Sequence, residues 1–170
     1  GAYNALAVEF ADHVVLFEPG PQNEERAQEI IAETKHVFPN KPIRYGVISH
    51  HHFDHTSGPP AVVAEDITIV TPEVNKAFLD RALSARRTLA PDSMSKSGRK
   101  PKIEGFTGDR RVFQDGFEGA VARRVIGEGM IEVEIRIGTR RELPNVAGER
   151  DGVPTDVRHL DRTLNEGTAP

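Results

Sequence analysis

Apolar and polar positions recur along much of the chain with the two periods that distinguish strands from helices. Short apolar, β-branched runs predict strands at residues 5–10, 13–17, 43–48, 67–70 and 130–137. Apolar stripes at helical spacing predict helices at residues 24–37 and 72–83. Because a helix leads into the buried strand at 43–48, the pattern predicts an α/β protein built on βαβ-like units.

Weaker features lie between these elements. Residues 59–64 can form a short helix, and the polar, basic run 84–102 predicts a solvated loop, with a substrate-facing flap as the alternative. His13, at the start of a strand, is expected at the surface. In the second long helix we expect the core face to be formed by Val74, Ala77, Phe78 and Leu83.

The composition limits the classes of function. With 170 residues there is room for one domain and a sizeable core. A net charge of −4 and a pI near 6.0 give no electrostatic case for nucleic acid or a membrane surface. The chain has no cysteine, which excludes disulfides and thiolate metal ligands. It also has no apolar run of about 18 residues, the length that a membrane span needs.

The strand at 43–48 runs out into Ser-His-His-His-Phe-Asp-His-Thr-Ser-Gly, which holds four of the seven histidines. In an extended chain, side chains alternate, so His50, His52 and Asp54 would share one side while His51 and Phe53 point the other way. Neutral imidazole and carboxylate are the ligands that zinc prefers, and iron or manganese also accept them. The segment therefore predicts a metal site at the end of a strand.

His55 follows Asp54 directly, where a bend in the chain could aim it at a second metal position. The same cluster could also be a remnant purification tag, or a histidine-rich loop that binds metal adventitiously. A tag would normally lie at a terminus and would not contain Phe-Asp, so a dedicated ligand cluster is the better interpretation.

The pattern His-x-His-x-Asp-His after an apolar strand resembles the metallo-β-lactamase superfamily. The resemblance extends over residues 1–116, where 108–116 looks like a further hairpin. It implies the first half of an αββα sandwich in residues 1–117. Residues 118–170 would then be a divergent, arginine-rich and poorly packed tail with one strand.

By this resemblance His50 and His52 would be two of the three histidines of a first metal site, and Asp54 and His55 would belong to a second. Asp54 would also be catalytic, because it orients the bridging water. Two zinc ions are implied for the intact family domain, with iron or manganese as alternatives. A metal-bound hydroxide would attack an ester, thioester, lactam or phosphoester. An acidic residue commonly follows the second strand near this loop, and Glu18 takes that place unless it is an ordinary loop carboxylate.

The resemblance implies a third histidine, a bridging aspartate and a final histidine downstream, and these are not recognisable. Between His55 and His159 there is no histidine, and His159 lies in an aperiodic segment. From Glu118 onward the chain has no aromatic residue and no lysine. We therefore expect a first half of the domain whose second half is missing or altered. An out-of-frame or misjoined reading would produce the same tail.

Two alternatives to a hydrolase follow from these departures. The chain could be a catalytically incompetent fragment with a partial metal site, weakly active or inactive unless a partner chain or His159 completes it. A related branch of the family uses one iron ion for dioxygenase chemistry. The expected partner is a small-molecule substrate, with no nucleic acid and no membrane. The chain opens at Gly1 without a methionine, so a signal peptide stays an option, and the cytoplasm is slightly favoured.

Overall fold

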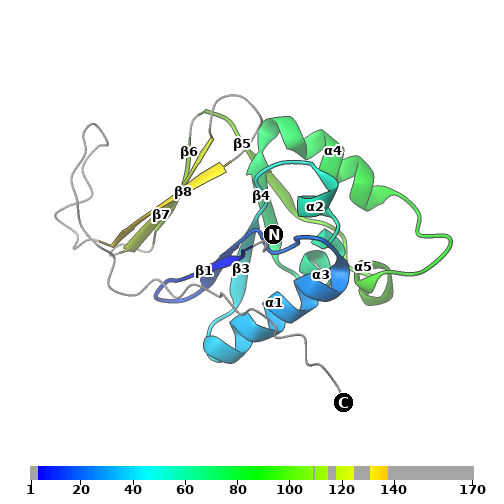
Figure 1. Ribbon diagram of the computed structural model, residues 1–170, viewed down its shortest axis with the longest axis horizontal. Helices are drawn as coiled ribbons and strands as arrows, with labels where there is room; N and C mark the ends of the chain where they lie inside the picture. The colour runs from blue at the N-terminus through cyan, green and yellow to red at the C-terminus, as the bar shows by residue number, and fades with distance from the viewer. Residues whose placement is uncertain (1–3, 109, 115–117, 125–130, 138–170) are drawn as a thin grey trace, which may run out of the picture.

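The computed structural model describes residues 4–108, 110–114, 118–124 and 131–137 (Figure 1). Its strands form two sheets, one five-stranded in the order β1-β2-β3-β4-β5 and one three-stranded in the order β6-β7-β8. The strands are β1 (Leu6–Glu9), β2 (Val14–Phe17), β3 (Ile43–Val47), β4 (Thr68–Pro72), β5 (Ile103–Phe106), β6 (Arg110–Gln114), β7 (Glu118–Arg124) and β8 (Ile131–Ile137). The helices are α1 (Glu24–Val37), α2 (Phe53–Thr56), α3 (Pro59–Ala64), α4 (Glu73–Ser84) and α5 (Ser93–Ser97).

The five-stranded sheet begins with a hairpin and continues in parallel. β1 pairs with β2 antiparallel, whereas β2, β3, β4 and β5 pair in parallel, so each later connection crosses over the sheet. The first crossover contains α1, whose N-cap Asn23 accepts a 2.8 Å hydrogen bond from the Arg26 backbone N–H. The predicted α/β class and the predicted βαβ unit are confirmed.

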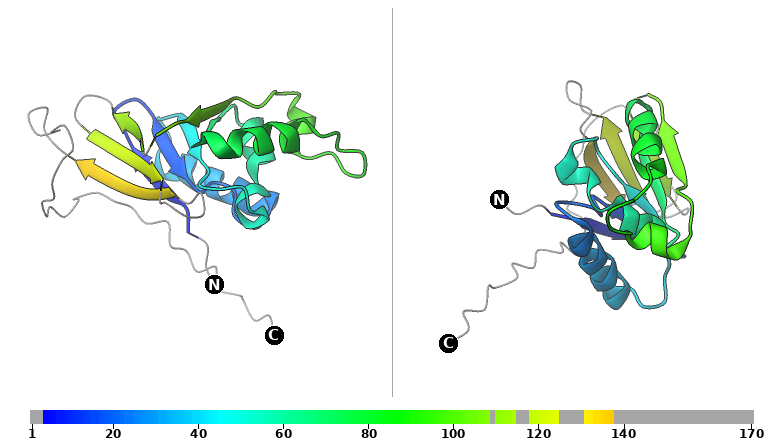
Figure 2. Two further views of the ribbon diagram at one scale, coloured as in Figure 1. Left: turned by 90° about the horizontal axis from the view of Figure 1, so that it is seen from above. Right: turned by 90° about the vertical axis from the view of Figure 1, so that its right-hand side faces the viewer.

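The sheet buries both of its faces. On β2, Val14 and Leu16 belong to the core under the helices, while Val15 and Phe17 belong to a second apolar cluster on the opposite face. Phe113 of β6 closes that second cluster, with its ring 6.0 Å from the ring of Phe17. The helices therefore lie on one side of the large sheet and the small sheet on the other, as the views in Figures 1 and 2 show.

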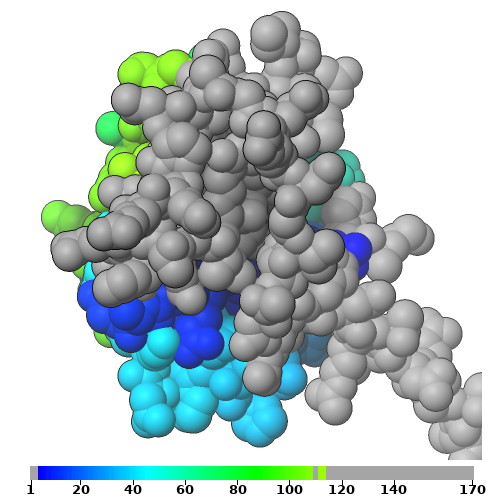
Figure 3. Space-filling view, turned by 90° about the vertical axis from the view of Figure 1, so that its left-hand side faces the viewer, coloured from blue at the N-terminus to red at the C-terminus, as the bar shows by residue number. Residues whose placement is uncertain are grey.

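Viewed from the side of the small sheet, the β1–β2 hairpin and the turn between α1 and β3 form the lower part of the coloured surface (Figure 3). His13 directly precedes β2 in this hairpin, and the prediction that it lies at the surface is wrong. Its side chain is buried, stacks on Phe10 at 4.8 Å between ring centroids, and contacts Asp12 Oδ1 through Nδ1 at 2.6 Å.

The predicted core face of α4 is right at Leu83, which is buried, and at Phe78, which packs against the main core, but it is wrong at the other two positions. Val74 is 66% exposed and Ala77 is exposed, whereas the buried positions are Asn75, Leu79 and Leu83. β4 continues through Pro72, which becomes the N-cap of α4 instead of its first residue. The apolar residues alone suggested a face rotated away from the true one, because the first buried position of the helix is an asparagine.

The run 84–102 is not simply a solvated loop. It contains α5, which begins at the N-cap Asp92 and ends at Gly98 in the left-handed conformation. Met94 is buried in the main core, and the Ser93 N–H donates to Glu24 Oε1 at 2.6 Å. The segment thus packs against α3 and is hydrogen-bonded to α1.

Several elements have no counterpart in the sequence predictions: α2, α5, β5 and β7. β7 pairs antiparallel with both β6 and the predicted strand β8, so the small sheet joins strands from both sides of the domain boundary expected at residue 117. That boundary stays a prediction, and the tail beyond residue 137 lies outside the described residues. Within the described ranges, no helix combines the length and apolar character that crossing a membrane requires.

Candidate metal centre

The candidate centre lies at the carboxyl ends of the parallel strands. Glu18 directly follows β2, residues 49–52 follow β3, and Asn75 lies just beyond β4. The Ile48 N–H donates to Val70 O at 2.9 Å, so the backbone is hydrogen-bonded to β4 at the last residue before the loop begins. Ligand sites in open parallel sheets form at this edge, because the loops that follow neighbouring strands meet there.

Three of the four predicted ligands come together here. His50, Asp54 and His55 each offer one ligand atom, and these atoms lie within 4.8 Å of one another. His50 is only 7% exposed, while Asp54 and His55 are half-buried. Among the described residues this is the group of three or more side chains with the spacing that a metal ion needs.

The route by which Asp54 reaches the cluster differs from the one predicted. The chain is extended through His52, with φ −64° and ψ 150°, but the next residues form the single turn α2. Asp54 and His55 are therefore neighbours on a helical turn, and strand alternation does not place Asp54 beside His50. Phe53, at the start of this turn, is 79% exposed.

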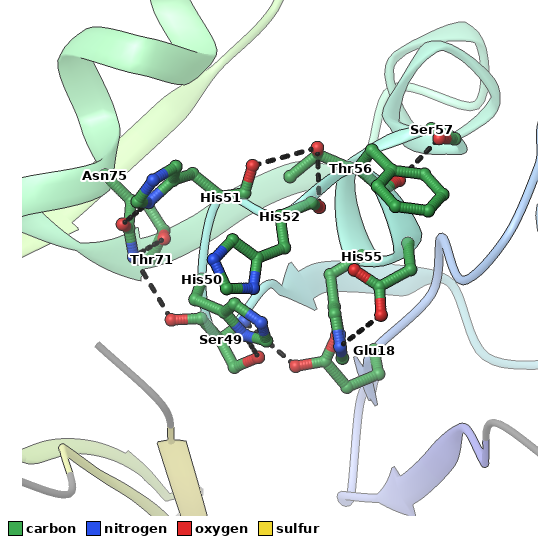
Figure 4. A network of polar contacts seen from close by, with 12 residues as sticks. Glu18, Ser49, His50, His51, His52, His55, Thr56, Ser57, Thr71 and Asn75 are labelled. Carbon is green, nitrogen blue, oxygen red and sulfur yellow. Dashed lines mark hydrogen bonds and ion pairs between the residues drawn. The ribbon is translucent and has the colours of Figure 1, made fainter. Parts of the chain in front are cut away.

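His52 and His51 lie on different sides of the loop (Figure 4). The ring of His52 is exposed and its centroid lies 4.7 Å from that of His50, so it borders the group of three. The ring of His51 points to α4, where its Nδ1 lies 3.1 Å from Asn75 Oδ1. The alternation predicted for residues 50 to 52 is thus present.

Glu18 links the loop to one candidate ligand. Its Oε1 accepts a 2.9 Å hydrogen bond from the Ser49 N–H, and its Oε2 lies 2.7 Å from His55 Nδ1. Because a carboxylate accepts, His55 Nδ1 carries the proton, and the other ring nitrogen, Nε2, lies 3.6 Å from Asp54 Oδ2. The hydrogen bond to Glu18 is also the main reason why the pKa of His55 is raised above its usual value. Glu18 has φ 52°, in the left-handed region that few residues other than glycine adopt.

His50 has the opposite electrostatic environment. Burial lowers the pKa of its imidazole, and the neighbouring charge of His55 lowers it further. Its Nδ1 lies 2.8 Å from Ser49 Oγ, which orients the ring. A lowered pKa favours the neutral imidazole, which is the form that binds a metal.

Two contributors were not found from the sequence. Ser49 and Asn75 carry no motif, and the burial of Asn75 on α4 is seen only in the structure. Glu18 was singled out, and its contact with His55 fits the place suggested for it. His159 lies outside the described residues, so its predicted role as a ligand stays a prediction.

Comparisons with known proteins agree on one family. The sequence model described as the Metallo-beta-lactamase superfamily matches residues 1–121. No match was found among curated proteins.

Solved structures show the same fold. A metallo-beta-lactamase from Pontibacter korlensis is 20% identical and superposes with a TM-score of 0.55, over 76% of this chain and 53% of that chain. MEM-A1, a subclass B3 enzyme from a soil metagenome library, is 18% identical with a TM-score of 0.55, over 78% of this chain and 51% of its own. BJP-1, a subclass B3 metallo-beta-lactamase of Bradyrhizobium japonicum, is 14% identical with a TM-score of 0.53, over 91% of this chain and 53% of that chain. The present chain spans about half the length of these structures.

Proposed function

This chain belongs to the metallo-beta-lactamase superfamily, and we propose that it is a metal-dependent hydrolase whose metal ion is held by His50, Asp54 and His55. The observation that carries the proposal is the convergence of three ligand atoms within 4.8 Å at the carboxyl edge of the sheet. His52 borders the same group and would serve as a further ligand. The proposed substrates are esters, thioesters, lactams or phosphoesters.

The chemistry of the donors fits a divalent metal ion. Two imidazoles and a carboxylate are a common set for zinc, and they also suit iron or manganese. Glu18 gives His55 the kind of carboxylate partner that metal-bound histidines usually have, and Ser49 plays a similar part for His50. The proposed second ion of an intact family domain would need donors beyond the described residues.

When bound, the ion lowers the pKa of a coordinated water and stabilises negative charge that develops on the substrate. The residues of the chain prepare the site for this chemistry. Glu18 keeps the proton on His55 Nδ1, so that Nε2 faces the ion. Burial lowers the pKa of His50 and so favours its neutral form. Asp54, as the proposed catalytic residue, would accept a hydrogen bond from the attacking water through a carboxylate oxygen and so orient it.

A zinc titration of the metal-free chain tests the proposal, with His50→Ala, Asp54→Ala and His55→Ala as variants. His36→Ala is the matched control, because that side chain is 81% exposed on α1 and far from the cluster in sequence. We expect zinc binding in the parent and the control, and loss of binding in the three cluster variants. Hydrolysis of a panel of chromogenic esters, thioesters, lactams and phosphoesters would identify the substrate class. Equal zinc affinity in all four variants would refute the site.

The alternative is a partial site without useful catalysis. It is supported by two observations: the chain spans only about half the length of the solved structures, and the described residues bring together only three candidate ligands. A catalytic zinc usually keeps three protein ligands and a water, and a two-metal site needs additional bridging groups. We therefore expect weak or no turnover by the 170-residue chain alone. Stoichiometric zinc binding with robust turnover that is lost in both His52→Ala and His159→Ala would overturn this expectation and make His159 a ligand.

A further inference from the structure

Asn75 is a polar side chain in an apolar setting. It lies in the first turn of α4, is 2% exposed, and shares the buried face of that helix with Leu79 and Leu83. An amide buried among apolar groups is costly unless its hydrogen-bonding atoms find partners. The contacts that satisfy Asn75 therefore indicate why it is placed there.

These contacts reach the segment from Ser49 to Thr56, between β3 and the end of α2, which is called the ligand loop below. The Asn75 Nδ2 donates to the Ser49 carbonyl at 3.1 Å and lies 3.4 Å from Thr71 Oγ1, while Asn75 Oδ1 lies 3.1 Å from His51 Nδ1 (Figure 4). A backbone carbonyl can only accept, so the nitrogen of the amide must face Ser49 and its oxygen must face His51. The proton of a neutral His51 ring is consequently on Nδ1.

The two partners flank His50 in the sequence. Asn75 binds the carbonyl of Ser49, the residue before His50, and the ring of His51, the residue after His50. It therefore fixes the chain on both sides of a candidate ligand. The ring of His51 also packs against Phe78, with 5.3 Å between centroids. Because side chains alternate in this extended stretch, holding His51 against α4 turns His50 and His52 toward the opposite side.

We infer that Asn75 is a positioning residue for the candidate metal centre: it fixes the Nδ1–H tautomer of His51 and the backbone around His50, and so aims His50 and His52 into the site. The link to metal binding rests on the proposed function, whereas the tautomer and the loop conformation do not. Replacing a residue that orients metal ligands without binding the metal typically weakens metal affinity about 10-fold to 100-fold. We expect a loss of that size for Asn75→Ala.

The first test uses the metal-free protein, beginning with the parent. ¹⁵N NMR of the histidine side chains distinguishes the two neutral tautomers at a pH where His51 is uncharged. We expect His51 to be protonated on Nδ1 in the parent, and Asn75→Ala to shift it toward the Nε2–H tautomer that a free histidine side chain favours. An Nε2–H tautomer of His51 in the parent would overturn the inference, whether or not the protein binds a metal ion.

The second test measures zinc affinity and the visible absorption spectrum of the cobalt-substituted protein. Asn75→Asp keeps an acceptor for His51 but has no N–H for the Ser49 carbonyl, and His51→Ala removes the other contact. We expect both to weaken zinc binding and alter the cobalt spectrum. Unchanged affinity and spectrum in Asn75→Asp and Asn75→Ala would overturn the inference.

Thr71→Val is the matched control, because Thr71 is fully buried and the hydrogen bond described for its side chain is with Asn75, not with a residue of the histidine segment. It should lower the melting temperature and leave the His51 tautomer and the zinc affinity within about twofold of the parent. If Thr71→Val weakens zinc binding as much as Asn75→Ala, general loosening explains the effect and Asn75 has no positioning role. A parent that binds no zinc would refute the proposed function, while the NMR result still decides the role of Asn75.

Discussion

Replacing Glu18 by glutamine separates its two contacts with the ligand loop. In the parent, Oε1 accepts from the Ser49 N–H at 2.9 Å and Oε2 lies 2.7 Å from His55 Nδ1. A glutamine side chain has one oxygen, so Glu18→Gln can keep only one of these acceptor roles, and neither with full charge. We expect the contact with His55 to be the one that weakens.

The size of the effect follows from the type of bond that is lost. A hydrogen bond to a charged group contributes about 1.5–3 kcal/mol, and the two side chains are only 19% and 23% exposed, so water replaces it poorly. If that bond orients His55 in the metal-bound state, losing it weakens zinc binding roughly 10-fold to 100-fold, since about 1.4 kcal/mol corresponds to a factor of ten.

Competition between the protein and a chromogenic chelator at neutral pH measures this change in zinc Kd. Glu9→Gln is the matched control, because Glu9 is the last residue of β1 and the ion pair described for it is with Lys41, which precedes β3. Urea unfolding of the metal-free variants shows whether the fold is intact. A zinc Kd for Glu18→Gln within about twofold of the parent, in a folded protein, would refute the role assigned to Glu18.

Three further predictions concern stability. In Gly58→Ala the new Cβ would lie 2.6 Å from Gly20 Cα, so we expect a loss of about 1–3 kcal/mol in the free energy of unfolding and weaker zinc binding; a loss below about 0.5 kcal/mol would contradict this. Leu79→Ala should cost about 2–5 kcal/mol in urea unfolding, whereas the exposed Val74→Ala should cost less than about 0.5; equal costs would mean that the α4 face is wrong. Hydrogen bonding, chiefly to His13, lowers the pKa of Asp12 from 3.8 to about 2. The ionised Asp12 carboxylate therefore stabilises the fold above pH 3.8, and this contribution fades as the pH falls toward 2. The difference in urea midpoint between the parent and Asp12→Asn should become smaller on acidification, and a constant difference would contradict this.

The sequence by itself determined the class of fold and the location of the candidate metal centre. Strand and helix periodicities are local, since each follows from which side of one element faces the core, and they predicted β2, α1 and β3 to within one residue at each end. The cluster of His50, Asp54 and His55 is local too, because its members lie within six consecutive residues. Local patterns of this kind need no knowledge of how the elements are assembled.

Only the tertiary structure decided which residues support the ligand loop and which face of α4 is buried. Glu18 meets His55 across 37 positions and Asn75 meets Ser49 across 26, because the parallel register of β2, β3 and β4 brings their carboxyl ends to one edge. No periodicity along one segment encodes such a meeting. The same assembly placed an asparagine at a core position of α4, where hydrophobic spacing favoured Val74 instead. A buried polar residue is stable only with partners, and partners distant in sequence exist only once the strands are paired.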